Sequence, residues 1–142
     1  MTAPAPGLPA DALLALSRRG LVEACTAATS AERYAAAHLS ALRAAAAVLA
    51  CRARPAIGRR GRPTSAWVLL AEVAPELGEW ARFFAAGAAK RAAAEAGSTR
   101  AVTEREADDL VRDADRFLGV VEQVLGLVPH APLQTQLVRH VS

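Results

Sequence analysis

TEREADDLVRDADRFLGVVEQVL, residues 103–125, is the stretch of sequence whose pattern decides the fold class. It opens with Thr103-x-x-Glu106, a capping box in which a hydroxyl and a carboxylate satisfy free backbone amides at the start of a helix. Apolar residues then recur at helical spacing without a break, at Ala107, Leu110, Val111, Ala114, Phe117, Leu118, Val121 and Leu125. Charged residues cover the opposite face: Asp108, Asp109, Arg112, Asp113 and Arg116. The stretch predicts an amphipathic helix before Gly126, and we expect it to be the central packing element.

Four further helices are predicted upstream of this stretch from apolar periodicity, capping residues, and glycine or proline boundaries. They cover about 10–27, from the Thr29-x-x-Glu32 capping box to about Arg54, a short segment capped by Thr64 or Ser65, and about 76–96 between Pro75 and Gly97. The second helix is expected to bury the stripe Ala35, His38, Leu39, Leu42, Ala46 and Leu49. Within the first helix, Gly20 is expected to allow close contact with a neighbour. The sequence therefore predicts an all-α, up-and-down bundle of about five helices.

Length and composition agree with one domain of closely packed helices. The chain has 142 residues, of which 53% are hydrophobic and only 4% aromatic, and much of the apolar content is alanine, the best helix former. We expect a disordered leader over 1–9, the bundle over 10–126, and a linker with a short amphipathic tail over 127–142. The longest apolar run is too short to cross a bilayer, and the N-terminus lacks the features of a signal peptide. A cytoplasmic location without membrane association is the expectation.

The two cysteines give no sign of a disulfide or a metal site. Cys25 and Cys51 fall near opposite ends of a predicted helical hairpin, about 30 Å apart at 1.5 Å per residue, which is far beyond disulfide reach. Because the sequence has no CxxC motif and no Cys/His cluster with ligand spacing, no metal and no cofactor is predicted. Both thiols are expected to be buried structural residues.

Three segments carry a resemblance to a known family. They are AERYAAAHLSALRAAAAVL (31–49), RGRPTSAWVLLAEVAPELGEWARFFAAGAAKRAAAEAG (60–97) and VTEREADDLVRDADRFLGVVEQVLG (102–126). In their order and spacing, they resemble HEPN domains, and within them a small group from high-GC bacteria. The resemblance implies a helical bundle that often dimerises. Many HEPN proteins are metal-independent ribonucleases that use an Arg-x4–6-His motif paired across a dimer, often as toxins beside a nucleotidyltransferase-type antitoxin; others are non-catalytic and bind nucleotides or partner proteins.

Arg33 and His38 have the spacing of this motif, with four residues between them. In a chain so rich in arginine, such a match is expected by chance, and the two residues lie about 140° apart around a helix. Family ribonucleases usually carry the motif in the second half of the domain, where this chain has no histidine between Ala41 and Pro129. His38 also falls on the apolar stripe, which favours a hydrogen-bonded core or interface histidine over a catalytic base.

The segment GRRGRPTS, residues 58–65, concentrates the remaining chemistry. Arg59, Arg60 and Arg62 precede Thr64 and Ser65 at a predicted helix N-terminus, where free amides and guanidinium forks suit phosphate. The Arg-Gly-Arg-Pro core also resembles an AT-hook, a short segment that lies in the DNA minor groove. Phosphate, nucleotide or RNA contact, minor-groove binding and a solvated surface loop without a ligand all remain open for this segment.

Three functions follow from these observations. The first is a non-catalytic HEPN-like module associated with nucleotide, RNA or a partner protein, such as a second copy of the chain or a nucleotidyltransferase-type protein. The second is a metal-independent endoribonuclease, toxin-like, that uses Arg33 and His38. The third is a structural protein-interaction bundle with no role in nucleic-acid binding. The first is the leading hypothesis.

Overall fold

The computed structural model describes residues 8–52, 65–98 and 100–133, and in these ranges every regular element is helical. The elements, in chain order, are α1 (Ala10–Thr26), α2 (Ser30–Arg52), α3 (Ala66–Val73), a 3-10 turn η1 (Pro75–Leu77), α4 (Gly78–Ala86), α5 (Ala88–Glu95) and α6 (Glu104–Val124). The predicted all-α bundle is confirmed. The predicted leader and tail fall largely on residues 1–7 and 134–142, which lie outside the described part of the chain.

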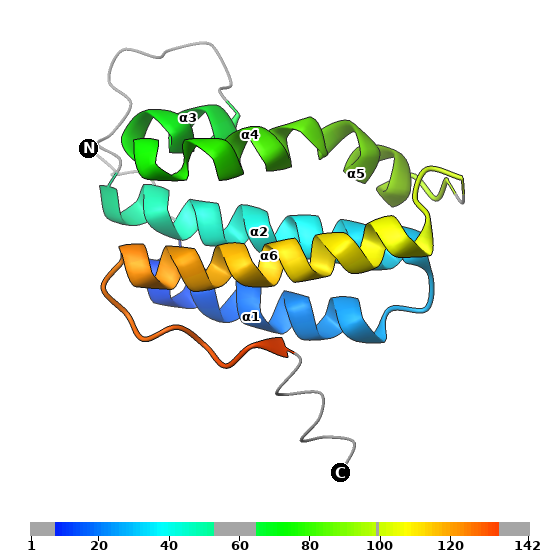
Figure 1. Cartoon of the computed structure of the whole chain (residues 1–142), viewed down its shortest axis with the longest axis horizontal. Coiled ribbons are helices and arrows are strands. Elements are labelled where there is room, and N and C mark those ends of the chain that lie inside the picture. Colours follow the sequence, from blue (N-terminus) through cyan, green and yellow to red (C-terminus); the bar gives the residue numbers. More distant parts are fainter. Residues whose placement is uncertain (1–7, 53–64, 99, 134–142) are drawn as a thin grey trace, which may run out of the picture.

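The helices form three layers around α2 (Figure 1). The short helices α3, α4 and α5 lie above α2 and α6, and α1 lies on the other side. Helix α2 packs against α1, α3, α5 and α6. We expected the helix after Thr103 to be the central packing element. The structure gives that position to α2, because α2 packs against four other helices, whereas α6 packs chiefly against α2 and α1.

Helix α2 is buried on several sides, and this overturns the single stripe expected for it. Of the six predicted stripe residues, only His38 is fully buried. The other buried positions of α2 are mostly small residues: Ala31, Tyr34, Ala37, Ser40, Ala41, Ala44, Ala45, Ala47 and Val48. Alanines face the neighbours because they let helices approach closely, whereas the larger leucines lie at the flanks, where there is room. By length and mean hydropathy, 1.4 over 18 residues, α2 could cross a membrane, but half of that window is buried in the bundle.

Glycines and hydroxyl groups mark two of the closest contacts with α2. A Cβ built at Gly20 of α1 would lie 3.4 Å from the Cβ of Ser40, so the close contact expected there is present. The Ser17 hydroxyl donates to the Ser40 carbonyl oxygen across the same contact, at 2.8 Å. At Gly87, a Cβ would lie only 2.8 Å from the Tyr34 hydroxyl oxygen, a distance that real contacts do not show.

The helix predicted over 76–96 is divided in two at Gly87. Pro75 opens a 3-10 turn, α4 follows to Ala86, and α5 begins at Ala88. Gly87 stands at the bend, and a side chain at this position would require the Tyr34 hydroxyl to move. Gly97 ends α5 in the left-handed region at φ +88°, as predicted.

The predicted caps are present where the structure describes them. Thr103 accepts from the Glu106 backbone amide, and Glu106 accepts from the Thr103 amide, which completes the capping box of α6. The Thr29 hydroxyl accepts from the Glu32 amide at 3.1 Å. Of the two cysteines, Cys25 is half-buried and Cys51 is exposed. The expectation of two buried thiols is therefore wrong for Cys51, which lies near the C-terminal end of α2.

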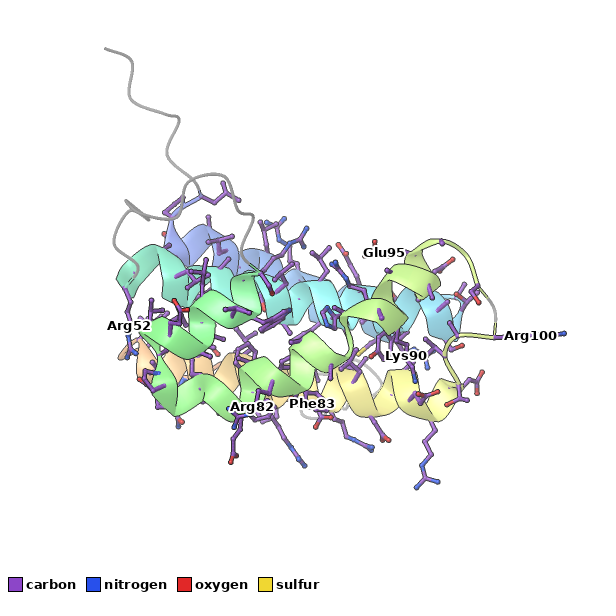
Figure 2. All side chains as sticks on the ribbon, turned by 90° about the horizontal axis from the view of Figure 1, so that it is seen from above. Arg52, Arg82, Phe83, Lys90, Glu95 and Arg100 are labelled. Atoms are coloured by element: carbon purple, nitrogen blue, oxygen red, sulfur yellow. The ribbon has the colours of Figure 1, made fainter. Side chains whose placement is uncertain are left out.

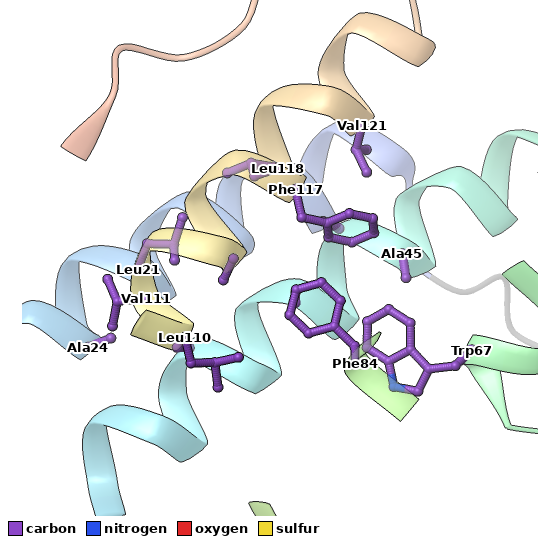
Figure 3. Close-up of a cluster of buried hydrophobic side chains, with 14 of the residues drawn as sticks. Leu21, Ala24, Ala45, Trp67, Phe84, Leu110, Val111, Phe117, Leu118 and Val121 are labelled. Carbon is purple, nitrogen blue, oxygen red and sulfur yellow. The ribbon is translucent and has the colours of Figure 1, made fainter. Parts of the chain in front are cut away.

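The core is an aromatic cluster between α2, the α3–α4 layer and α6 (Figure 3). Phe84 and Phe117 are fully buried, with ring centroids 5.1 Å apart, and Trp67 stacks on Phe84 at the same distance. Trp80 completes the group at 5.5 Å from Phe117. Four rings in mutual contact explain how a chain with few aromatics fills a space that alanines alone would leave empty.

Truncation of Phe117 tests this core. Phe117→Ala should lower the free energy of unfolding by about 3–5 kcal/mol, because it removes a fully buried ring and leaves a cavity. Phe83→Ala is the matched control, since Phe83 on α4 is 46% exposed and should change stability little. Chemical denaturation of both variants measures the difference. Equal stabilities for the two would contradict the assignment of Phe117 to the core.

Candidate functional site

Arg33 and His38 are held apart by contacts with different parts of the bundle. The Arg33 guanidinium forms an ion pair with Asp108 of α6, with 2.6 Å between the nitrogen and oxygen atoms. His38 is 1% exposed, and its Nε2 lies 2.8 Å from the carbonyl oxygen of Phe84 on α4. One residue therefore ties α2 to α6 at the surface, while the other ties α2 to α4 inside the core.

The state of the His38 ring follows from these contacts. A carbonyl oxygen can only accept, so Nε2 donates its proton to Phe84 and the neutral ring carries a lone pair on Nδ1. Nδ1 is buried without a hydrogen-bond partner, and the rings of Tyr34, Trp67 and Phe84 surround the imidazole. Burial lowers the pKa of His38, which keeps the ring neutral. This is the environment of a core histidine.

Of the predicted anion-binding residues, the structure describes Ser65 alone. Arg59, Arg60, Arg62 and Thr64 lie outside the described residues. The Ser65 hydroxyl accepts from the Trp67 amide at 3.2 Å and so caps α3, as one of the two alternatives predicted. Segment 58–64 thus leads directly into a capped helix N-terminus.

The charge of the chain is unevenly divided between its described and undescribed parts. All 14 acidic residues lie in the described part. Five of the 17 basic residues lie outside it: Arg54, Arg59, Arg60, Arg62 and Arg139. The described helices therefore carry more acidic than basic groups, and the excess positive charge of the chain comes from the remaining residues, chiefly the segment 54–62.

A second cluster, which the sequence patterns did not reveal, centres on His130. We name residues 127–133 the strap; it follows α6 and returns along it toward α1 (Figure 1). The His130 Nδ1 lies 2.6 Å from an oxygen of Glu122, and its Nε2 lies 2.6 Å from an oxygen of Asp115. Both carboxylates come from α6, so His130 holds the strap against that helix. We name these two contacts the His130 clasp.

Glu122 is the most buried charged group of this cluster and is 2% exposed. It also pairs with Arg18 of α1 at 3.1 Å and accepts from the His130 amide at 3.0 Å. A buried carboxylate is costly unless it is paired, and these partners offset that cost. A sequence signal did exist: Glu122 follows Leu118 and Val121 at helical spacing, next to the buried stripe, which predicts a partner that arrives from elsewhere in the chain.

In the described part of the chain, no three histidine, cysteine or carboxylate side chains gather in a way that would hold a metal ion.

On the other side of the molecule from the His130 cluster, the exposed groups belong to α4 and α5. Arg82 and Phe83 project outward from α4, and Lys90 of α5 forms an ion pair with Glu106 (Figure 2). Lys90, like Arg33 and His38, is thus used in a contact between two helices.

The His130 clasp predicts a dependence of stability on pH. Hydrogen bonds to Asp115, and to a lesser extent Glu122, raise the pKa of His130 above its ordinary value of 6.5 despite partial burial. A raised pKa in the folded state means that the contribution is fully present below pH 6.5 and is lost as the pH rises through the folded-state pKa. Thermal melts from mildly acidic to mildly alkaline pH should show this loss in the parent and a smaller one in His130→Gln. An NMR titration that gives His130 a pKa at or below 6.5 would contradict the clasp.

The family comparison agrees with the fold and with the predicted resemblance. The family described as HEPN_SAV_6107-like HEPN matches residues 24–122, from the end of α1 to the end of α6. No curated protein and no solved structure matches the chain. Because the family match spans more than half of the 142 residues, the chain belongs to the HEPN family.

Proposed function

We propose that this protein is a non-catalytic HEPN module that acts by binding. The observation that carries the proposal is the position of His38, which is 1% exposed with its Nε2 hydrogen bonded to the Phe84 carbonyl oxygen. A general base must come within hydrogen-bond reach of the proton that it removes. His38 lines a pocket of about 250 Å³ beside Lys90, but its ring is almost fully covered and its Nε2 is already bonded to Phe84. Arg33 lies on another face of α2, in an ion pair with Asp108.

An RNA cleavage assay tests this proposal. The purified protein should leave single-stranded and structured RNA intact. Arg33→Ala is the informative variant, because Arg33 is not part of the core and its removal should leave the fold in place. Arg43→Ala, on the same helix but outside the motif, is the matched control. Cleavage by the parent and by Arg43→Ala that is abolished in Arg33→Ala would establish the ribonuclease alternative.

For the ligand, we favour a polyanion such as RNA or a nucleotide, bound by residues 58–65. The support is the charge distribution, since the described helices carry more acidic than basic groups and the concentration of arginines lies in the segment next to Ser65. Ser65 caps α3, and a helix N-terminus attracts anions. Helix α6 is a poor alternative, because its charged residues are mostly acidic.

A partner protein is the second candidate, and a separate observation favours it. Val68 of α3 and Phe83 of α4 are 50% and 46% exposed, and Val68 borders an apolar groove of about 310 Å³ between these helices. Exposed apolar patches of this kind often mark contact surfaces. A second copy of the chain and a nucleotidyltransferase-type protein, with or without a toxin role, stay predictions from the family resemblance.

Replacement of the three arginines tests the polyanion site. Arg59, Arg60 and Arg62, all changed to Gln, should weaken RNA binding and flatten its salt dependence, with the slope falling by roughly 0.7 for each phosphate that is no longer neutralised. The control is a triple change to Gln of three exposed arginines that have no ion-pair partner in the described part: Arg19, Arg100 and Arg105. Fluorescence anisotropy at several salt concentrations compares the two. Equal weakening in both triple variants would mean that binding follows net charge alone.

A further inference from the structure

We infer that a cavity between the strap and α6 binds a small amphipathic anion, a monocarboxylate with an aliphatic or aromatic body. The cavity has a volume of about 430 Å³, and none of the residues of the aromatic cluster lines it. Its walls include Val111 of α6, with Pro132 and Leu133 of the strap. A mainly apolar cavity of this size with a few polar groups is typical of small-molecule sites. The inference is independent of the proposed function.

The strap that forms the outer wall is fixed at both ends. At its start, the Leu127 amide donates to the Glu122 carbonyl oxygen at 2.8 Å. At its end, His130 contacts Asp115 and Glu122, and the Leu133 amide lies 3.4 Å from a carboxylate oxygen of Asp115. These contacts hold the wall at a distance from α6 before any ligand arrives, so the cavity is preformed and binding would cost little ordering.

Gly119 supplies an independent observation. It lies in the interior of α6 and lines the cavity, and a Cβ built on it would have no heavy atom within 4 Å. A glycine in a helix interior costs about 1 kcal/mol relative to alanine. At Gly20 and Gly87, the absence of a side chain allows close packing, but at Gly119 no neighbour requires it. Because Gly119 has no side chain, the α6 wall of the cavity stays open at this position.

The charges around the cavity select an anion. Asp115 and Glu122 are paired with His130 and Arg18, and Arg112 is paired with Asp109. Arg116 lines the cavity, is exposed, and has no ion-pair partner in the described ranges, although Asp113 lies one helical turn before it. One guanidinium is therefore left for a ligand, and a carboxylate fits its fork geometry. The half-buried Cys25 thiol on the α1 side completes the wall.

Three probes with the same chain length test the charge selection. Octanoate, octanol and octylammonium should be titrated into the full chain by calorimetry, below the concentrations at which they aggregate. Octanoate should bind more tightly than octanol, and octylammonium should bind most weakly. Arg116→Gln should weaken octanoate by about fivefold and leave octanol unchanged, as expected for one partly exposed ionic contact. Arg105→Gln, an exposed arginine on the same helix outside the cavity, is the matched control.

Gly119→Leu tests the location of the site. The added side chain has space and replaces a helical glycine, so the variant should melt at or above the parent temperature while octanoate binding is abolished. Retained octanoate binding in folded Gly119→Leu would overturn the proposal. Equal binding of all three probes, or no binding of octanoate to the full chain, would overturn it as well.

Discussion

Close packing of neighbours against α2 is the constraint on which the rest of this structure depends. Most of its buried residues are alanine or serine, and these small side chains let α1 approach closely at Gly20, where an added Cβ would lie 3.4 Å from the Ser40 Cβ. Small residues provide little hydrophobic area each, and the bundle compensates with one cluster of large rings around Phe84 and Phe117. The rings come from α3, α4 and α6, so the cluster joins the α3–α4 layer to α6.

This packing also decides what Arg33 and His38 can do. Their spacing in the sequence matches a ribonuclease motif. However, α2 has neighbours on several sides, and Arg33 and His38 each bind a different neighbouring helix. His38 provides a donor for the Phe84 carbonyl oxygen near the α4–α5 bend, and Arg33 provides a charge for Asp108. A central helix leaves few of its polar side chains free for chemistry, so the pair stabilises contacts between helices.

The sequence predicted the local features of the fold well and the relations between helices poorly. The Thr103 capping box, the buried stripe of α6 and the stop at Gly97 depend on residues close in the chain, and all three are present. The stripe expected on α2 was wrong because hydrophobicity ranks leucine above alanine, whereas a helix enclosed by others buries whichever residues let them approach. The close approach of Gly87 to the Tyr34 hydroxyl joins positions more than fifty apart in the chain, and no local pattern contains that information.

The His130 cluster was missed for a related reason, and it shows how a buried charge organises distant segments. Glu122 lies beside the apolar stripe of α6, where an unpaired carboxylate would strongly destabilise the fold. Its partners are Arg18 of α1 and His130 of the strap, which follows α6. The strap is then held over α6 with a cavity beneath it. The contacts of a single buried glutamate beside the apolar stripe thus hold residues 127–130 of the strap against α6.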